Sequence, residues 1–154
     1  MIRVQRDDFD IGKELDLLAG DDHSIGGVAS FIGLVRDVLG PGGGPERVSA
    51  LTLEHYPGMT EKKLAEIEAE ANRRWPLSAS LIIHRYGRLE PGDRIVLVAT
   101  ASPHREAALA ACHFLIDWLK TDAPFWKSEA TAQGERWVAA RTEDDAASRR
   151  WRDG

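Results

Sequence analysis

The chain has 154 residues, of which 43% are hydrophobic and 29% charged, so its composition predicts one folded domain over residues 1–154 and excludes a disordered or fibrous chain. The 20 Lys and Arg residues stand against 25 Asp and Glu, and the net charge of -5 argues against a nucleic-acid binder. The chain shows neither a signal peptide nor an apolar run of ~18 residues, so no membrane role is expected. Its single cysteine, Cys112, favours a reducing compartment, and the cytoplasm is the expected location.

The first third of the chain predicts two strands, a short helix and a third strand. Residues 2–6 alternate apolar and polar side chains, as a half-buried strand does. Asp10 is expected to cap a helix that Gly20 ends. The apolar, β-branched segment 26–35 predicts a central strand, and segment 48–56 is expected to pair with it in a hairpin.

The remaining two thirds alternate helices with short strands. The Gly- and Pro-rich residues 40–45 predict a mobile surface loop at about 38–47. Thr60 is expected to cap a helix that runs to about Trp75. A longer helix is expected to start after Ser102 and to end before Pro124. Further strands are expected at 80–86, 94–101, 125–131 and 136–139, and the polar end at about 144–154 predicts a frayed helix or tail.

Strands and helices alternate only partly in this order. Two expected hairpins interrupt the βαβ pattern: segments 26–35 and 48–56, and segments 80–86 and 94–101 on either side of the turn Glu90-Pro91-Gly92-Asp93. An α+β fold with a mixed or mainly antiparallel sheet is therefore favoured over a doubly wound fold.

Chemistry is first suggested where a strand meets the longest helix, at Ser102-Pro103-His104-Arg105. Backbone N–H groups and the positive end of the helix dipole favour an anion there, and two basic side chains in that turn are unfavourable without one. A phosphate or carboxylate site and a pair of solvated side chains both fit this pattern.

Two lysines follow at the other end of that helix. Lys120 lies in the expected last turn, where a cation meets the dipole favourably, so a plain helix-end charge also explains it. Lys127 follows Phe125 and Trp126, whose burial would remove water from the ammonium group and lower its pKa. Such a lysine can act as a nucleophile or proton carrier, although a surface lysine that passes over Trp126 fits equally well.

Other polar residues have simpler interpretations. Arg36 either places its guanidinium in a cleft or pairs with Asp37 or Glu54. His55 and His84 fall within strands and are expected to be packed histidines, because no second ligand stands at metal-site spacing. No metal and no cofactor are expected, and Cys112 is expected to be a buried, inert thiol.

Taken together, several segments resemble the large, catalytic subunit of molybdopterin synthase. The order and spacing of the segments make the resemblance specific. The matching segments are Ser30–Arg36, Leu53–Met59, His84–Leu89, Pro91–Asp93, Ser102–Arg105, Asp117–Lys120 and Ala123–Glu129.

The resemblance implies an α/β-hammerhead fold with an additional antiparallel sheet. It also implies sulfur transfer to cyclic pyranopterin monophosphate, which forms the dithiolene of molybdopterin. The sulfur donor is a small ubiquitin-like subunit with a C-terminal thiocarboxylate. Large subunits of this family form a dimer with a small subunit at each end, a heterotetramer.

By the same resemblance, Lys120 and Lys127 match the two active-site lysines, and Arg36, His104 and Arg105 match residues that hold the pterin phosphate. The sequence departs from the family in the 40–45 insert. It departs again at Ser128, where a basic residue commonly follows the second lysine.

A non-catalytic scaffold is the alternative function. It would use the same basic helix start to dock the C-terminal carboxylate of a partner, without turnover.

Overall fold

A computed structural model describes residues 1–37, 49–131, 134–138 and 142–152. For residues 135–138 and 142–145 it describes the backbone only. Its larger part is a mixed sheet in the order β1-β4-β6-β2. The strands are β1 (Ile2–Gln5), β4 (Ala79–Arg85), β6 (Arg94–Ser102) and β2 (Gly27–Leu34). β1 runs parallel to β4, and the other two pairs are antiparallel.

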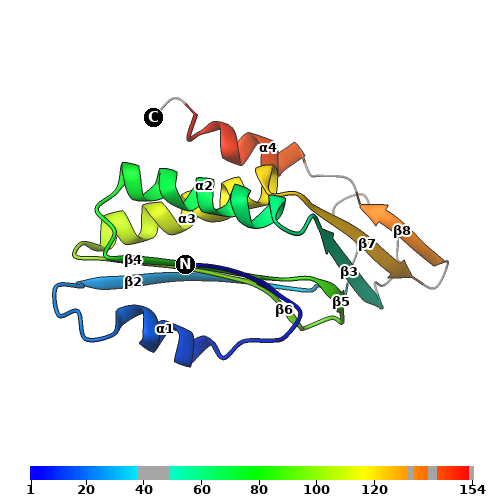
Figure 1. Ribbon diagram of the computed structural model, residues 1–154. Coiled ribbons are helices and arrows are strands. Elements are labelled where there is room, and N and C mark those ends of the chain that lie inside the picture. Colours follow the sequence, from blue (N-terminus) through cyan, green and yellow to red (C-terminus); the bar gives the residue numbers. More distant parts are fainter. Residues whose placement is uncertain (38–48, 132–133, 139–141, 153–154) are drawn as a thin grey trace.

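A second sheet, in the order β5-β3-β7-β8, projects beyond one end of the first (Figure 1). Its strands are β5 (Gly87–Leu89), β3 (Ala50–His55), β7 (Phe125–Thr131) and β8 (Gly134–Val138), and all three pairs are antiparallel. The expected α+β fold with an additional antiparallel sheet is confirmed.

Four helices complete the architecture. α2 (Met59–Arg74) and α3 (Arg105–Asp122) cover one face of the first sheet, and α1 (Ile11–Ala19) covers the other (Figure 1). α4 (Thr142–Arg149) lies on the outer side of α2 and α3 and overlaps the stretch at about 144–154 that was expected to be a frayed helix or tail. No helix among the described residues has the length and apolar character that a membrane crossing needs.

The core lies on both faces of the first sheet, because its strands carry apolar side chains on both. Leu64, Ile82, Val98, Phe114 and Leu115 pack between the sheet and helices α2 and α3. A smaller cluster with Leu81, Ile83 and Leu97 packs against α1. The second sheet has a small core of its own: Val35, Leu51, Leu53 and Leu89.

Helix starts and ends follow local sequence signals in most places. The Asp10 carboxylate accepts the Lys13 N–H at 3.0 Å, and Gly20 ends α1, as expected. At α2 the expected cap is wrong, because Gly58 rather than Thr60 precedes the first turn. The Glu61 carboxylate instead accepts the Gly58 N–H at 2.6 Å, which leaves Thr60 buried inside the helix.

Two expectations for the strands are also wrong. β2 is an edge strand of the first sheet rather than a central one, and its side chains Val28, Phe31 and Leu34 are exposed. β3 does not form a hairpin with β2, because it pairs with β5 and β7 in the second sheet. Residues 38–48, which include the loop expected at 38–47, lie outside the described part of the chain.

Candidate functional site

The C-terminal end of α3 and the start of β7 carry the two predicted lysines. Lys120 lies in the last turn of α3, and Lys127 is the third residue of β7. The connection between the two elements is short, and the Ala123 N–H still donates to the Leu119 carbonyl at 3.3 Å. The side chains of both lysines are exposed in the single chain.

The pairing of β3 with β7 decides which way Lys127 points. Lys127 stands opposite Leu53, and Phe125 stands opposite His55. Directly paired residues of antiparallel strands share a face of the sheet, as do residues two apart along one strand. Lys127 therefore lies on the same face as Phe125 and His55.

Strand alternation also corrects the expected surroundings of Lys127. Trp126 faces the opposite side of β7, where its ring meets that of Tyr56 edge-on with centroids 4.2 Å apart. Because Trp126 is on the other face and Lys127 is exposed, burial beside Trp126 does not remove water from this ammonium group.

His84 is a buried histidine that packs against the start of β7. It lies near the end of β4, is 5% exposed, and stacks flat on the Phe125 ring with centroids 3.7 Å apart. Burial, together with the positive charges of Lys127, Lys120 and His55, lowers the pKa of His84 to about 3, against the opposing effect of its hydrogen bond to the Arg85 carbonyl. Lys120 and Lys127 stand at the two ends of the short connection between α3 and β7, and both charges act on this imidazole.

We call this region the lysine site and define it by five residues: Lys120, Lys127, His84, His55 and Phe125. His55 lies on the same face of the second sheet as Lys127. The His55 ring lies 4.3 Å from the Tyr86 ring, between centroids, and its Nε2 lies 3.9 Å from a Glu61 carboxylate oxygen.

Thr60 holds the start of α2 against the same region. Its buried hydroxyl accepts the Tyr56 N–H at 3.2 Å and donates to the Pro124 carbonyl at 3.2 Å. This bond ties the first turn of α2 to the connection between α3 and β7, and so to both lysines.

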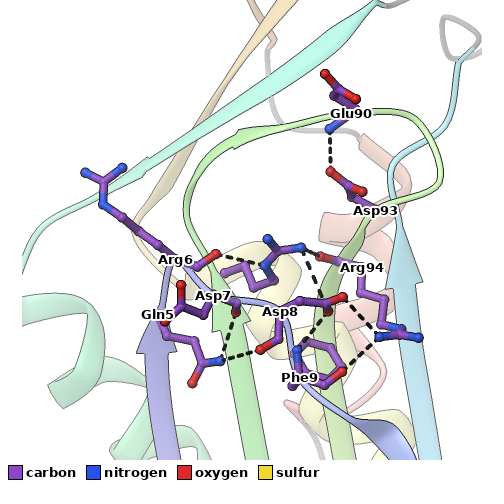
Figure 2. Close-up of polar contacts among 9 residues, drawn as sticks. Gln5, Arg6, Asp7, Asp8, Phe9, Glu90, Asp93 and Arg94 are labelled. Carbon is purple, nitrogen blue, oxygen red and sulfur yellow. Dashed lines mark hydrogen bonds and ion pairs between the residues drawn. The ribbon is translucent and has the colours of Figure 1, made fainter.

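The ends of β1 and β4 and the start of β6 are braced on the side of the molecule away from α2 and α3. The Arg85 guanidinium donates to the backbone carbonyls of Arg6 and Arg94, each at 3.0 Å. Figure 2 shows the Arg94 side chain reaching Asp8, at 3.1 Å, and the Phe9 carbonyl, at 2.9 Å. Against the opposing effect of burial, the Phe9 N–H, which donates to the Asp8 carboxylate at 2.8 Å, and the charges of Arg94 and Arg85 hold the pKa of Asp8 below its usual value.

A separate open pocket of about 410 Å³ lies at the N-terminus of α3. Its lining residues are Gly26, Pro103, His104, Arg105 and Glu106. A Cβ at Gly26 would lie 2.1 Å from the Pro103 carbonyl oxygen, so only glycine fits there. The α3 N-cap, His104, makes no side-chain capping bond, so first-turn N–H groups remain available to an anion.

In one chain, the predicted site residues fall into two groups. Arg105 and Lys120 are separated by roughly 22 Å along the axis of α3, at ~1.5 Å per residue. Arg36 follows β2 and is exposed. Because Leu34 pairs with Arg94, the first residue of β6, Arg36 lies at the end of the sheet where β6 begins. Arg36 is therefore at the same end of the sheet as the lysines, and His104 and Arg105 are at the other.

Sequence reasoning treated His84 and His55 as packed histidines, which they are, but did not place them beside the lysines. The sequence does place both histidines near the ends of strands. Which residues lie beside them, however, depends on the pairing of β3 with β7, which the sequence did not predict. The expectation for Cys112 is confirmed, since burial raises the pKa of its thiol to about 11. In the described part of the chain, no group of three His, Cys, Asp or Glu side chains gathers as a metal site.

Comparison with known proteins agrees with this architecture. The chain matches the MoaE protein family over residues 4–122. It is 57% identical over 150 residues to the molybdopterin synthase catalytic subunit of Ralstonia nicotianae, covering 97% of this chain and 83% of the relative.

Two solved structures share the fold along almost the whole chain. The molybdopterin biosynthesis MoaE protein of Burkholderia ambifaria has a TM-score of 0.82 and 54% identity, covering 98% of this chain and 97% of the other. Molybdopterin synthase of Staphylococcus aureus has a TM-score of 0.80 and 31% identity, covering 89% of this chain and 96% of the other.

Proposed function

The chain belongs to the MoaE protein family and acts in molybdenum cofactor biosynthesis, and we propose that, as the catalytic subunit of a molybdopterin synthase, it transfers sulfur at the lysine site. The substrate is cyclic pyranopterin monophosphate, and the product carries the dithiolene. The sulfur donor is the C-terminal thiocarboxylate of a small ubiquitin-like subunit. The observation that carries the proposal is the placement of Lys120, in the last turn of α3, and Lys127, in β7, at the two ends of one short connection.

The charges at the lysine site suit this chemistry. Attack by a thiocarboxylate sulfur brings an anionic donor to an anionic substrate, and the resulting repulsion must be offset. Lys120 and Lys127 supply two positive charges from different elements, α3 and β7. They are also candidates for the proton transfers that loss of water requires, together with His104. His84 is excluded from those transfers near neutral pH, since a pKa of about 3 keeps it uncharged there.

The pocket at the N-terminus of α3 is the proposed phosphate site. His104, Arg105 and the free N–H groups of the first turn offer both charge and hydrogen bonds to a phosphate. A substrate held there cannot reach the lysine site of the same chain, given the separation of roughly 22 Å along α3. We therefore propose that two copies of the chain form a dimer in which the α3 N-terminus of one copy faces the lysine site of the other. With a small subunit on each copy, the assembly is a heterotetramer, and the cytoplasm is its proposed compartment.

Reconstitution tests this function. Purified chain, thiocarboxylated small subunit and cyclic pyranopterin monophosphate are mixed, and the dithiolene product is measured. Product that depends on all three components is expected. Binding of the small subunit with no product would instead indicate a non-catalytic scaffold.

A further inference from the structure

Thr60 is a buried threonine whose hydroxyl makes two hydrogen bonds. It lies in the first turn of α2 and is 0% exposed. Its Oγ1 accepts the Tyr56 N–H at 3.2 Å and donates to the Pro124 carbonyl at 3.2 Å. A hydroxyl carries one hydrogen, and the Tyr56 N–H cannot accept it, so that hydrogen is committed to Pro124. Thr60 thus joins the start of α2 to the connection between α3 and β7 (Figure 1).

The turn that presents Thr60 is fixed by its own hydrogen bonds. The Thr60 N–H donates to the Tyr56 carbonyl at 2.9 Å, so two bonds join this pair of residues. The Glu61 carboxylate accepts the Gly58 N–H at 2.6 Å in the same turn. Gly58 has a φ of 85°, in the left-handed region that favours glycine. The Thr60 hydroxyl therefore reaches Pro124 from a rigid support.

The connection that receives this bond has a lysine on either side. Lys120 precedes Pro124 by one helical turn, in the last turn of α3, and Lys127 follows it in β7. Proline has no N–H, so the Pro124 peptide unit can be held by hydrogen bonding only through its carbonyl. The next N–H, that of Phe125, donates to the Ala123 carbonyl at 2.9 Å and stays within the connection. The bond from Thr60 is the one that fixes the middle of the connection to a different helix.

Other contacts hold the two sides of this point. Lys63 of α2 lies 4.0 Å from Asp122, between Nζ and a carboxylate oxygen, and both side chains are partly exposed. An ion pair of that kind contributes little to a fixed geometry. Phe125 stacks on the buried ring of His84 with centroids 3.7 Å apart. The stack fixes the start of β7, and the bond from Thr60 fixes the residue before it.

We propose that Thr60 is a positioning residue of the lysine site: its hydroxyl holds the Pro124 carbonyl and thereby sets where Lys120 and Lys127 lie relative to each other. A displacement of about 1 Å in a reacting group can lower a rate by roughly 100-fold, so a single bond at this point matters for catalysis. The effect of Thr60 on sulfur transfer rests on the proposed function. Its effect on the connection does not.

Two variants of Thr60 separate its hydroxyl from its bulk. Thr60→Val keeps the size of the side chain and removes the hydroxyl, whereas Thr60→Ser keeps the hydroxyl and removes the methyl group. Thr100 of β6 provides a matched pair, Thr100→Val and Thr100→Ser. It is also 0% exposed, and its Oγ1 donates to the Ala108 carbonyl in the first half of α3, away from the lysines.

Amide hydrogen exchange of the purified chain, followed by NMR, measures the connection directly. We expect Thr60→Val to speed exchange of the Phe125 amide by roughly fivefold, the effect of one hydrogen bond of ordinary net strength. Thr60→Ser should leave this exchange near that of the wild type. Thr100→Val should lower the melting temperature without changing exchange at Phe125.

Steady-state kinetics with saturating small subunit measure the consequence for the reaction. Thr60→Val should lower kcat by at least about tenfold, because the lysines are displaced. The KM for the pterin should stay within about twofold of the wild-type value, since the proposed phosphate site lies at the other end of α3. Thr60→Ser should restore kcat, and Thr100→Val should retain it.

Wild-type exchange at Phe125, or a wild-type kcat, in folded Thr60→Val would overturn the proposal, as would an equal loss of kcat in Thr100→Val. If Thr60→Val does not fold, Thr60→Ala takes its place with the same expectations. Failure of both to fold would make the hydroxyl a requirement of the fold and would overturn the proposal as well. A wild-type chain that forms no dithiolene would instead refute the proposed function, and exchange at Phe125 would still decide whether Thr60 positions the connection.

Discussion

Helix α3 has basic side chains at both ends, and the two ends are built differently. At its N-terminus, the pocket arises from neighbours in sequence, Pro103 to Glu106, with Gly26 as the distant contributor. At its C-terminus, the charges of Lys120, Lys127 and His55, which come from α3, β7 and β3, all act on the buried ring of His84 in β4. The first end is a local feature of a strand-to-helix connection, whereas the second exists only once both sheets are formed.

This difference predicts that residues at one end of α3 bind the substrate and that residues at the other end take part in the reaction. The N-terminal pocket offers N–H groups and fixed charges, which suit a phosphate. The lysine site offers two cations next to a neutral, buried imidazole, which suits a reacting group that gains negative charge. Variants at the two ends should therefore affect different kinetic constants.

Lys120→Ala is expected to have the largest effect, a loss of dithiolene formation, because one of the two lysine cations of the site is removed. Stability should change little, since an exposed lysine at a helix end contributes only ~0.3–1 kcal/mol. Product formation and thermal unfolding are measured side by side. Lys62→Ala, at an exposed lysine of α2, is the control and should remain active. Near-normal turnover in Lys120→Ala would contradict a catalytic role.

Arg105→Ala should affect substrate binding rather than turnover. Loss of one charge-assisted hydrogen bond weakens the binding free energy by about 1.5–3 kcal/mol. This corresponds to a rise of roughly 10- to 150-fold in the half-saturation concentration of the pterin. Steady-state kinetics with saturating small subunit measure it, and Arg149→Ala, at an exposed arginine of α4, serves as control. An unchanged half-saturation concentration would move the phosphate site elsewhere.

Gly26→Ala is expected to have the smallest effect, one on stability. Its Cβ would meet the Pro103 carbonyl oxygen at 2.1 Å, so backbone must shift, at a cost of about 1–3 kcal/mol. Gly27→Ala is a matched control, because the nearest atom to its Cβ is an ordinary contact at 3.8 Å. Thermal unfolding of both variants measures the difference, and equal melting temperatures would show that the α3 N-terminal pocket tolerates a side chain at Gly26.

Features that depend on residues close in sequence could be predicted, whereas features that depend on the pairing of distant strands could not. The cap at Asp10, the turn before Arg94 and the start of α3 depend on residues close in sequence, and each was predicted. The pairing of β3 was not, because the strand that follows β2 in the chain lies in a different sheet. β5 has only three residues, too few to show an alternating pattern.

The candidate site divides in the same way. Ser102-Pro103-His104-Arg105 suggested an anion site from local electrostatics alone. The grouping of Lys120 and Lys127 into one site entered only through the resemblance to a family, because it depends on the register that sets Lys127 opposite Leu53. The stacking of His84 on Phe125 likewise joins two strands that are distant in sequence, β4 and β7.

The most direct test of the central claim, that the two ends of α3 serve one reaction in a dimer, is complementation between two impaired variants. Lys120→Ala and Arg105→Ala are mixed under conditions that allow subunit exchange, with substrate below the raised half-saturation concentration, and dithiolene formation is measured. In a mixed dimer, one site carries both changes and the other neither, so free exchange should restore about a quarter of wild-type activity. The Lys120→Ala protein mixed with itself is the baseline. Activity that never exceeds the average of the two separate variants, despite proven exchange, would contradict the claim that each site draws on both copies.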